Sequence, residues 1–128
     1  MKIAIMGAGG LGGFFGGKLA QAGHDVWFIA RGQQLAALKT SGLRLQGPDP
    51  EIVISHPNAT EMPAEIGAVD LVLFCVKLYD IEPAAALIKP ILTDATAVIS
   101  VLNGIDGPQR LAAALETGTV FSLSLIHI

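Results

Sequence analysis

KIAIMGAGGLGG, residues 2–13, decides the fold, because an apolar run ends there at a cluster of glycines. Residues 2–6 are short, apolar and partly β-branched, as in a buried strand. After the glycines, Leu11, Phe15 and Leu19 follow at intervals of four, which places them on one face of a helix. The stretch therefore predicts a strand, a tight turn and a helix.

Three glycines of this turn, Gly7, Gly9 and Gly12, have the GxGxxG spacing of a dinucleotide-binding loop. The spacing alone is a weak signal, but here it separates a predicted strand from a predicted helix. Such glycines permit the tight turn, the approach of backbone to a pyrophosphate, and close packing of helix on sheet. We expect the pyrophosphate-binding residues to be Gly7, Ala8, Gly9, Gly10, Leu11 and Gly12. A turn without a ligand is the alternative, and Gly16 and Gly17 are expected to serve helix packing.

Strands and helices alternate along the rest of the chain. The patterns predict a strand at 26–30, a short helix closed near Gly42, a hairpin within 43–54, and the longest core strand at 69–77. A helix through 82–90, a strand from Thr96, a helix capped by Asp106 and a final strand from Gly118 follow. This order predicts the α/β class: a Rossmann-type, doubly wound, mostly parallel sheet with helices on both faces.

Composition narrows the class of protein. The 128 residues carry a net charge of −3 with no cluster of Lys and Arg, which argues against nucleic acid as a partner. No stretch approaches the roughly 20 apolar residues of a membrane helix, so we expect no membrane partner. The single Cys75 excludes an intramolecular disulfide and fits a buried strand thiol in the reducing cytoplasm. No metal site is expected.

The tip of the second predicted strand bears on the choice of cofactor. An Asp or Glu at this position would bind the ribose 2′-hydroxyl of NAD, but the sequence here is FIARG. Arg31 instead offers a planar, permanently charged group suited to a 2′-phosphate. The sequence therefore favours NADPH over NADH, with a solvated surface arginine as the alternative for Arg31.

Lys77 and Asn103 both follow core strands, at the edge where ligands of doubly wound sheets bind. A lysine at a strand end that extends to solvent is the alternative for Lys77. A simple turn is the alternative for Asn103, because Asn-Gly is a common turn dipeptide.

Taken together, the glycine loop, ARG at the second strand tip, CVK before a helix and VLNGI before another resemble the N-terminal domain of the 2-dehydropantoate 2-reductase (ketopantoate reductase) family. The resemblance implies a cytoplasmic, NADPH-dependent oxidoreductase that reduces 2-dehydropantoate to pantoate in pantothenate and coenzyme A biosynthesis. It implies that the glycine loop, Arg31 and Lys77 bind NADP, and that Asn103 lies near both the nicotinamide and the 2-keto acid substrate. The chain departs from the family in the sequence NGID, residues 103–106, because Asp106 follows the hydrophobic Ile105 where the family more usually has a glycine.

In this family the proton-donating lysine and most substrate-binding residues belong to a C-terminal helical domain. We therefore expect residues 1–122 to be an NADP-binding Rossmann domain truncated before its catalytic partner, and we assign no catalytic residue. His24 and His56 fall in predicted turns, where we expect no catalytic role. The tail LSLIHI, residues 123–128, matches the translation of a transposon-based sequencing adaptor, so we expect it to be non-native. The alternatives are a free-standing NADP-binding or redox-sensing module and a reductase of another 2-keto acid.

Overall fold

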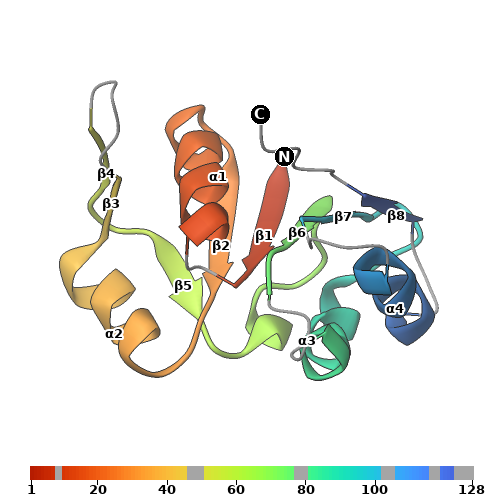
Figure 1. The fold of residues 1–128 in the computed structure, drawn as a ribbon. Coiled ribbons are helices and arrows are strands. Elements are labelled where there is room, and N and C mark those ends of the chain that lie inside the picture. The colour runs from red at the N-terminus through yellow and green to blue at the C-terminus, as the bar shows by residue number, and fades with distance from the viewer. Residues whose placement is uncertain (8–9, 46–50, 77–80, 102–105, 116–118, 123–128) are drawn as a thin grey trace.

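Six parallel strands form the central sheet of the computed structural model (Figure 1). The structure describes residues 1–7, 10–45, 51–76, 81–101, 106–115 and 119–122. The strands lie in the order β5-β2-β1-β6-β7-β8. Their bounds are β1 Lys2–Met6, β2 Asp25–Ile29, β5 Asn58–Thr60, β6 Leu71–Phe74, β7 Ala97–Ser100 and β8 Thr119–Ser122. From β1 the chain adds β2 and then β5 on one side of β1, and it then adds β6, β7 and β8 on the other side. This order confirms the doubly wound α/β fold.

Helices connect the parallel strands, since parallel neighbours need crossover connections. The α-helices are α1 Gly10–Gln21, α2 Gly32–Ser41, α3 Ile81–Ile88 and α4 Asp106–Leu115, and short 3₁₀ turns are η1 Pro63–Glu65 and η3 Lys89–Ile91. The predicted hairpin is confirmed as β3 Leu43–Leu45 paired antiparallel with β4 Ile52–Ile54. In Figure 1 it stands to one side of the main sheet.

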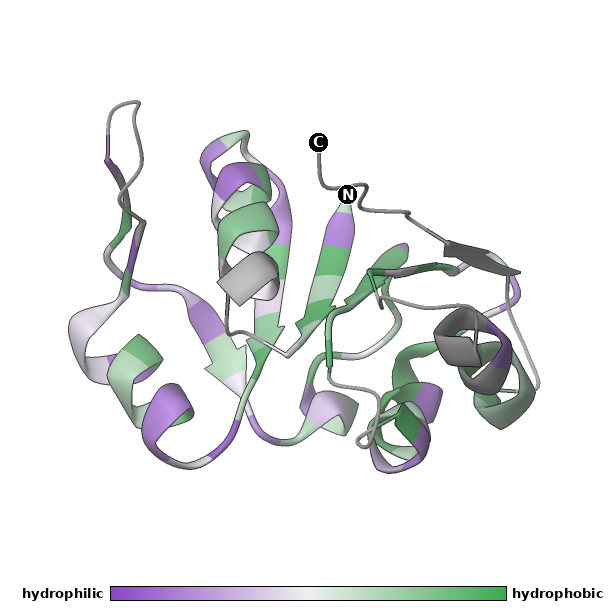
Figure 2. Cartoon of the chain, in the orientation of Figure 1, coloured by the Kyte–Doolittle hydropathy of each residue, from purple (hydrophilic) through white to green (hydrophobic). Residues whose placement is uncertain are grey.

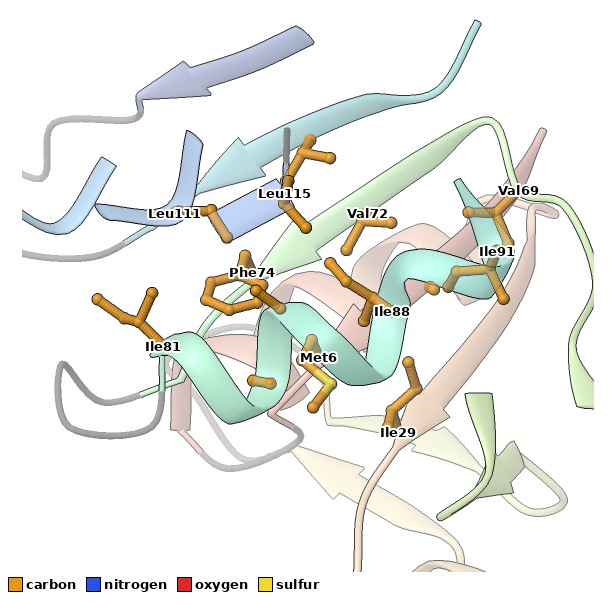
Figure 3. Close-up of a cluster of buried hydrophobic side chains, with 14 of the residues drawn as sticks. Met6, Ile29, Val69, Val72, Phe74, Ile81, Ile88, Ile91, Leu111 and Leu115 are labelled. Carbon is orange, nitrogen blue, oxygen red and sulfur yellow. The ribbon is translucent and has the colours of Figure 1, made fainter. Parts of the chain in front are cut away.

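Alternation along β1 divides the core into two clusters, one on each face of the sheet. Ile3 and Ile5 pack with Phe28 and with Leu38 of α2, whereas Ala4 belongs to the cluster beneath α3 and α4. Figure 3 shows this second cluster, in which Ile81, Ile88, Leu111 and Leu115 meet Val72 and Phe74 of the sheet. The hydrophobic colour of the inner strands in Figure 2 reflects their burial on both faces.

Two strands differ from the sequence prediction. The strand expected at 69–77 spans only Leu71–Phe74, and at four residues it is shorter than the five-residue β1 and β2. The prediction of the longest strand was therefore wrong, because apolar character continues through residues that no longer pair as a strand. The second difference is β5, which the sequence did not predict. Asn58–Thr60 has little apolar pattern, and it is a strand because it pairs with Trp27, Phe28 and Ile29 of β2.

Candidate dinucleotide-binding site

A row of backbone hydrogen bonds joins the carboxyl ends of five strands. Ala30 N donates to Thr60 O at 3.0 Å, and Gly7 N donates to Ile29 O at 3.4 Å. Farther along the same edge, Cys75 N donates to Met6 O at 2.8 Å and Val101 N donates to Phe74 O at 3.0 Å. Each bond extends a strand pairing past the end of the strand. The edge at which doubly wound sheets bind their ligands is therefore held together across β5, β2, β1, β6 and β7.

Gly7 turns the chain out of β1 with a φ of +93°, which L side chains rarely adopt. The neighbouring chain also leaves no room for a side chain there. A Cβ at this position would lie 2.9 Å from the carbonyl oxygen of Cys75 and 3.3 Å from Val76 N. Both the conformation and the contact with the chain leaving β6 require glycine, as the sequence predicted for the tight turn.

Gly12 is buried in the first turns of α1, where the helix comes close to Gly7. A Cβ on Gly12 would overlap the carbonyl oxygen of Gly7 and would lie 3.2 Å from Ile5 Cγ2. Gly16, one turn further on, would likewise meet the ring of Phe28. The close approach of α1 to β1 and β2 therefore depends on glycine at these positions, which agrees with the predicted helix packing.

The first turn of α1 follows this loop directly, since the helix begins at Gly10. The first N–H groups of a helix have no partner within the helix, so they can bind an anionic ligand. A glycine turn followed closely by a helix N-terminus is the arrangement that binds a pyrophosphate in dinucleotide-binding folds. The described residues of the loop thus fit a dinucleotide.

Arg31 lies two residues beyond β2 at the same edge, and its side chain is exposed. Its backbone is extended, with φ −143° and ψ 165°, and it forms the N-cap of α2 without a side-chain capping bond. Among the residues that the structure describes, its guanidinium has no ion-pair partner; the ion pair found is between Arg44 and Glu51. Arg31 therefore remains available for an anionic group at the tip of β2.

The other predicted residues lie wholly or partly outside the described ranges. Gly10 and Leu11 are placed as helical backbone at the start of α1, whereas Ala8 and Gly9 fall outside the described part of the loop. Lys77 and Asn103 also lie outside the described residues, so of these two regions the structure describes the strands β6 and β7 that precede them. Those strands end on the edge that carries Gly7 and Arg31.

Cys75 lies at this edge, one residue past β6 rather than inside the strand as expected, and it is partly buried. Burial raises the pKa of its thiol to about 12 from a usual 9.0. The thiol is therefore protonated at neutral pH and is a poor nucleophile.

No other functional centre emerges from the described residues. They hold no group of three or more His, Cys, Asp or Glu side chains that could bind a metal ion. None of the helices within the described ranges has the length and apolar character needed to cross a bilayer.

Thr60 is a residue of this edge that the sequence did not indicate. It is 5% exposed, and its hydroxyl has partners in the turn that follows β5. The position of Thr60 depends on the pairing of β5 with β2. A strand of three residues without an apolar pattern gives no sequence signal for this pairing.

Comparison with known proteins agrees with this geometry. The family model described as "Ketopantoate reductase PanE/ApbA" matches residues 3–127. The chain belongs to the ketopantoate reductase family. Over 106 residues it is 41% identical to a 2-dehydropantoate 2-reductase of Mesorhizobium japonicum, covering 82% of this chain and 32% of that protein. The chain thus spans about a third of the length of this relative.

Solved structures of ketopantoate reductases and of a related dehydrogenase resemble the fold. A PanE/ApbA family ketopantoate reductase from Ralstonia eutropha JMP134 matches with a TM-score of 0.87 and 41% identity, over 95% of this chain and 40% of that one. D-mandelate dehydrogenase, solved with NADH and anilino(oxo)acetate, matches with a TM-score of 0.83 and 28% identity, over 95% of this chain and 40% of that one. The family resemblance and the Rossmann-type fold expected from the sequence are therefore confirmed.

Proposed function

We propose that this chain is the NADPH-binding domain of a cytoplasmic 2-dehydropantoate 2-reductase, which forms pantoate for pantothenate and coenzyme A biosynthesis. The observation that carries the proposal is the pairing of two features at one sheet edge. The glycine turn at Gly7 and Gly12 excludes side chains, and the tip of β2 presents an exposed Arg31. Membership of the ketopantoate reductase family supports the reaction.

The proposed roles follow the chemistry of each group. The loop from Gly7 to Gly12 holds the pyrophosphate through backbone amides, and Arg31 binds the 2′-phosphate through its guanidinium fork. Lys77 belongs to the same cofactor site, and Asn103 contacts both the nicotinamide end and the 2-keto acid. When bound, the nicotinamide supplies the hydride that reduces the C2 ketone.

The proposed domain limits rest on the sequence and not on the family match, which extends to residue 127. Residues 1–122 form the cofactor domain, and residues 123–128, which lie outside the described ranges, are a non-native tail. Ketone reduction also needs a general acid beside the developing alkoxide and a site that orients the substrate. We assign these tasks to a helical domain that packs beside this one.

A second candidate is a reductase of another 2-keto acid. The likeness to D-mandelate dehydrogenase, which was solved with NADH, favours it specifically. Nothing so specific favours a free-standing NADP-binding module.

The proposal is tested on the full-length product of the gene. Sequencing the genomic DNA across the region that encodes residue 122 also establishes the native sequence there. Consumption of NADPH is followed with 2-dehydropantoate and, as a control, with benzoylformate, the keto acid that corresponds to mandelate. We expect the higher kcat/KM with 2-dehydropantoate. A higher value with benzoylformate, or equal use of NADH, would favour the second candidate.

A further inference from the structure

We propose that Thr60 is a positioning residue for cofactor selectivity: it holds the backbone that carries Arg31, and Arg31 binds the 2′-phosphate. This inference rests on the proposed NADPH site and adds a residue to it. Thr60 is the last residue of β5, on the edge strand next to β2. Its side chain does not need to touch the cofactor for this role.

The backbone on both sides of Arg31 rests on β5. Before Arg31, Ala30 N donates to Thr60 O at 3.0 Å, one residue beyond the pairing of Ile29 with Thr60. After Arg31, the chain enters α2, and that helix also contacts β5. The direction in which the exposed arginine leaves the sheet therefore depends on where the end of β5 lies.

The hydroxyl of Thr60 fixes that end. It accepts a hydrogen bond from Met62 N at 3.0 Å and donates one to Glu65 Oε2 at 3.1 Å. The Met62 carbonyl oxygen is a more distant acceptor at 3.5 Å. Because Thr60 is 5% exposed, water cannot readily replace both partners. The hydroxyl thus ties the carboxyl end of β5 to η1, and through Ala30 it holds the backbone that carries Arg31.

The test compares the affinities of the chain for NADPH and NADH, by calorimetry, in matched variants. Thr60→Val keeps the shape but removes the hydroxyl, and Thr60→Ser restores it. Thr40→Val is the control, because the Thr40 hydroxyl donates to Ala36 O within its own helix α2, at 2.8 Å. Thr60→Val removes both hydrogen bonds of the hydroxyl. A loss at Arg31 of about the net worth of one of them predicts NADPH binding weaker by roughly five-fold, with NADH binding changed less than about two-fold. Thr60→Ser and Thr40→Val are expected to keep the wild-type ratio of affinities.

A double-mutant cycle with Arg31→Ala separates positioning from a general effect on stability. If Thr60 acts through Arg31, Thr60→Val weakens NADPH binding no further once Arg31 is absent. The same loss in both backgrounds, or equal losses for NADPH and NADH, would overturn the inference. If Thr60→Val does not fold, Glu65→Ala carries the test, since it removes the acceptor of the Thr60 hydroxyl from an exposed position. An unchanged ratio of affinities in a folded Glu65→Ala would then overturn the inference.

Failure of this inference differs from failure of the proposed function. A wild-type chain that prefers NADPH, with unchanged selectivity in the Thr60 variants, contradicts only the positioning role. A wild-type chain that binds NADH as tightly as NADPH contradicts the proposed 2′-phosphate site, and the positioning role with it.

Discussion

Replacing Gly12 by Ala tests whether α1 must approach the loop as closely as the structure shows. The new Cβ would overlap the carbonyl oxygen of Gly7 and would lie 3.1 Å from its carbonyl carbon and 3.2 Å from Ile5 Cγ2. A backbone oxygen cannot rotate away as a side chain can, so the helix or the loop has to move. We therefore expect a loss of both stability and cofactor affinity in Gly12→Ala.

The size of the effect follows from two opposing terms. Forcing a methyl group into a packed contact costs about 1–3 kcal/mol, and overlap with backbone puts Gly12→Ala at the upper end. Alanine regains about 1 kcal/mol of helix propensity over glycine, which leaves a net loss of about 2 kcal/mol. With an m-value of about 2 kcal/mol/M in urea, the unfolding midpoint falls by about 1 M.

Urea unfolding followed by fluorescence measures this loss, because Trp27 is the only tryptophan and is partly buried in the core. Gln21→Ala, at the exposed end of the same helix, is the control and should stay within about 0.5 kcal/mol of the wild type. A Gly12→Ala variant that unfolds at the wild-type midpoint and binds NADPH normally would refute the close-approach argument.

Three further predictions concern charge, ionisation and a buried hydroxyl. Arg31→Ala should weaken NADPH binding by about ten-fold or more and leave NADH binding nearly unchanged, because only NADPH carries the 2′-phosphate; equal losses in calorimetry would contradict this. The raised pKa of Cys75 means that the unfolded thiol ionises above pH 9.0 while the folded thiol stays neutral up to about 12, so stability falls as pH rises through this window. Between pH 8 and pH 10 the wild type should lose about 1 kcal/mol more than Cys75→Ala in urea unfolding, and parallel profiles would speak against it. Thr96, 1% exposed, donates to Val69 O at 2.7 Å and accepts from Thr93 N at 2.9 Å, so Thr96→Val should cost about 1–3 kcal/mol in thermal unfolding and Thr96→Ser much less. Similar melting temperatures for these two variants would show that the hydroxyl does not matter.

Sequence patterns predicted the parts of the fold that local chemistry determines. The change from a strand period to a helix period across the glycines located β1, the turn and α1, because both faces of β1 are buried and Gly7 adopts a positive φ. The hairpin was predictable from alternation on either side of a proline and glycine turn. The tip of β2 was located from the apolar run VWFIA, residues 26–30, which placed Arg31 at the ligand edge.

What the sequence did not predict depends on contacts between distant segments. β5 is a strand only because it pairs with β2, and Asn-Ala-Thr has no periodicity of its own. Thr60 joins residue 30 to residue 65, and no local pattern marks such a link. The end of β6 was overestimated because apolar character shows burial but does not show where pairing stops.

The most direct test of the central claim is calorimetric titration of this chain with NADPH and NADH under identical buffer and salt. We expect one site per chain that binds NADPH at least about ten-fold more tightly than NADH, with the preference lost in Arg31→Ala. Salt must be held constant because exposed charge pairs weaken as ionic strength rises. Equal affinity for the two cofactors, or tighter binding of NADH, would contradict the account.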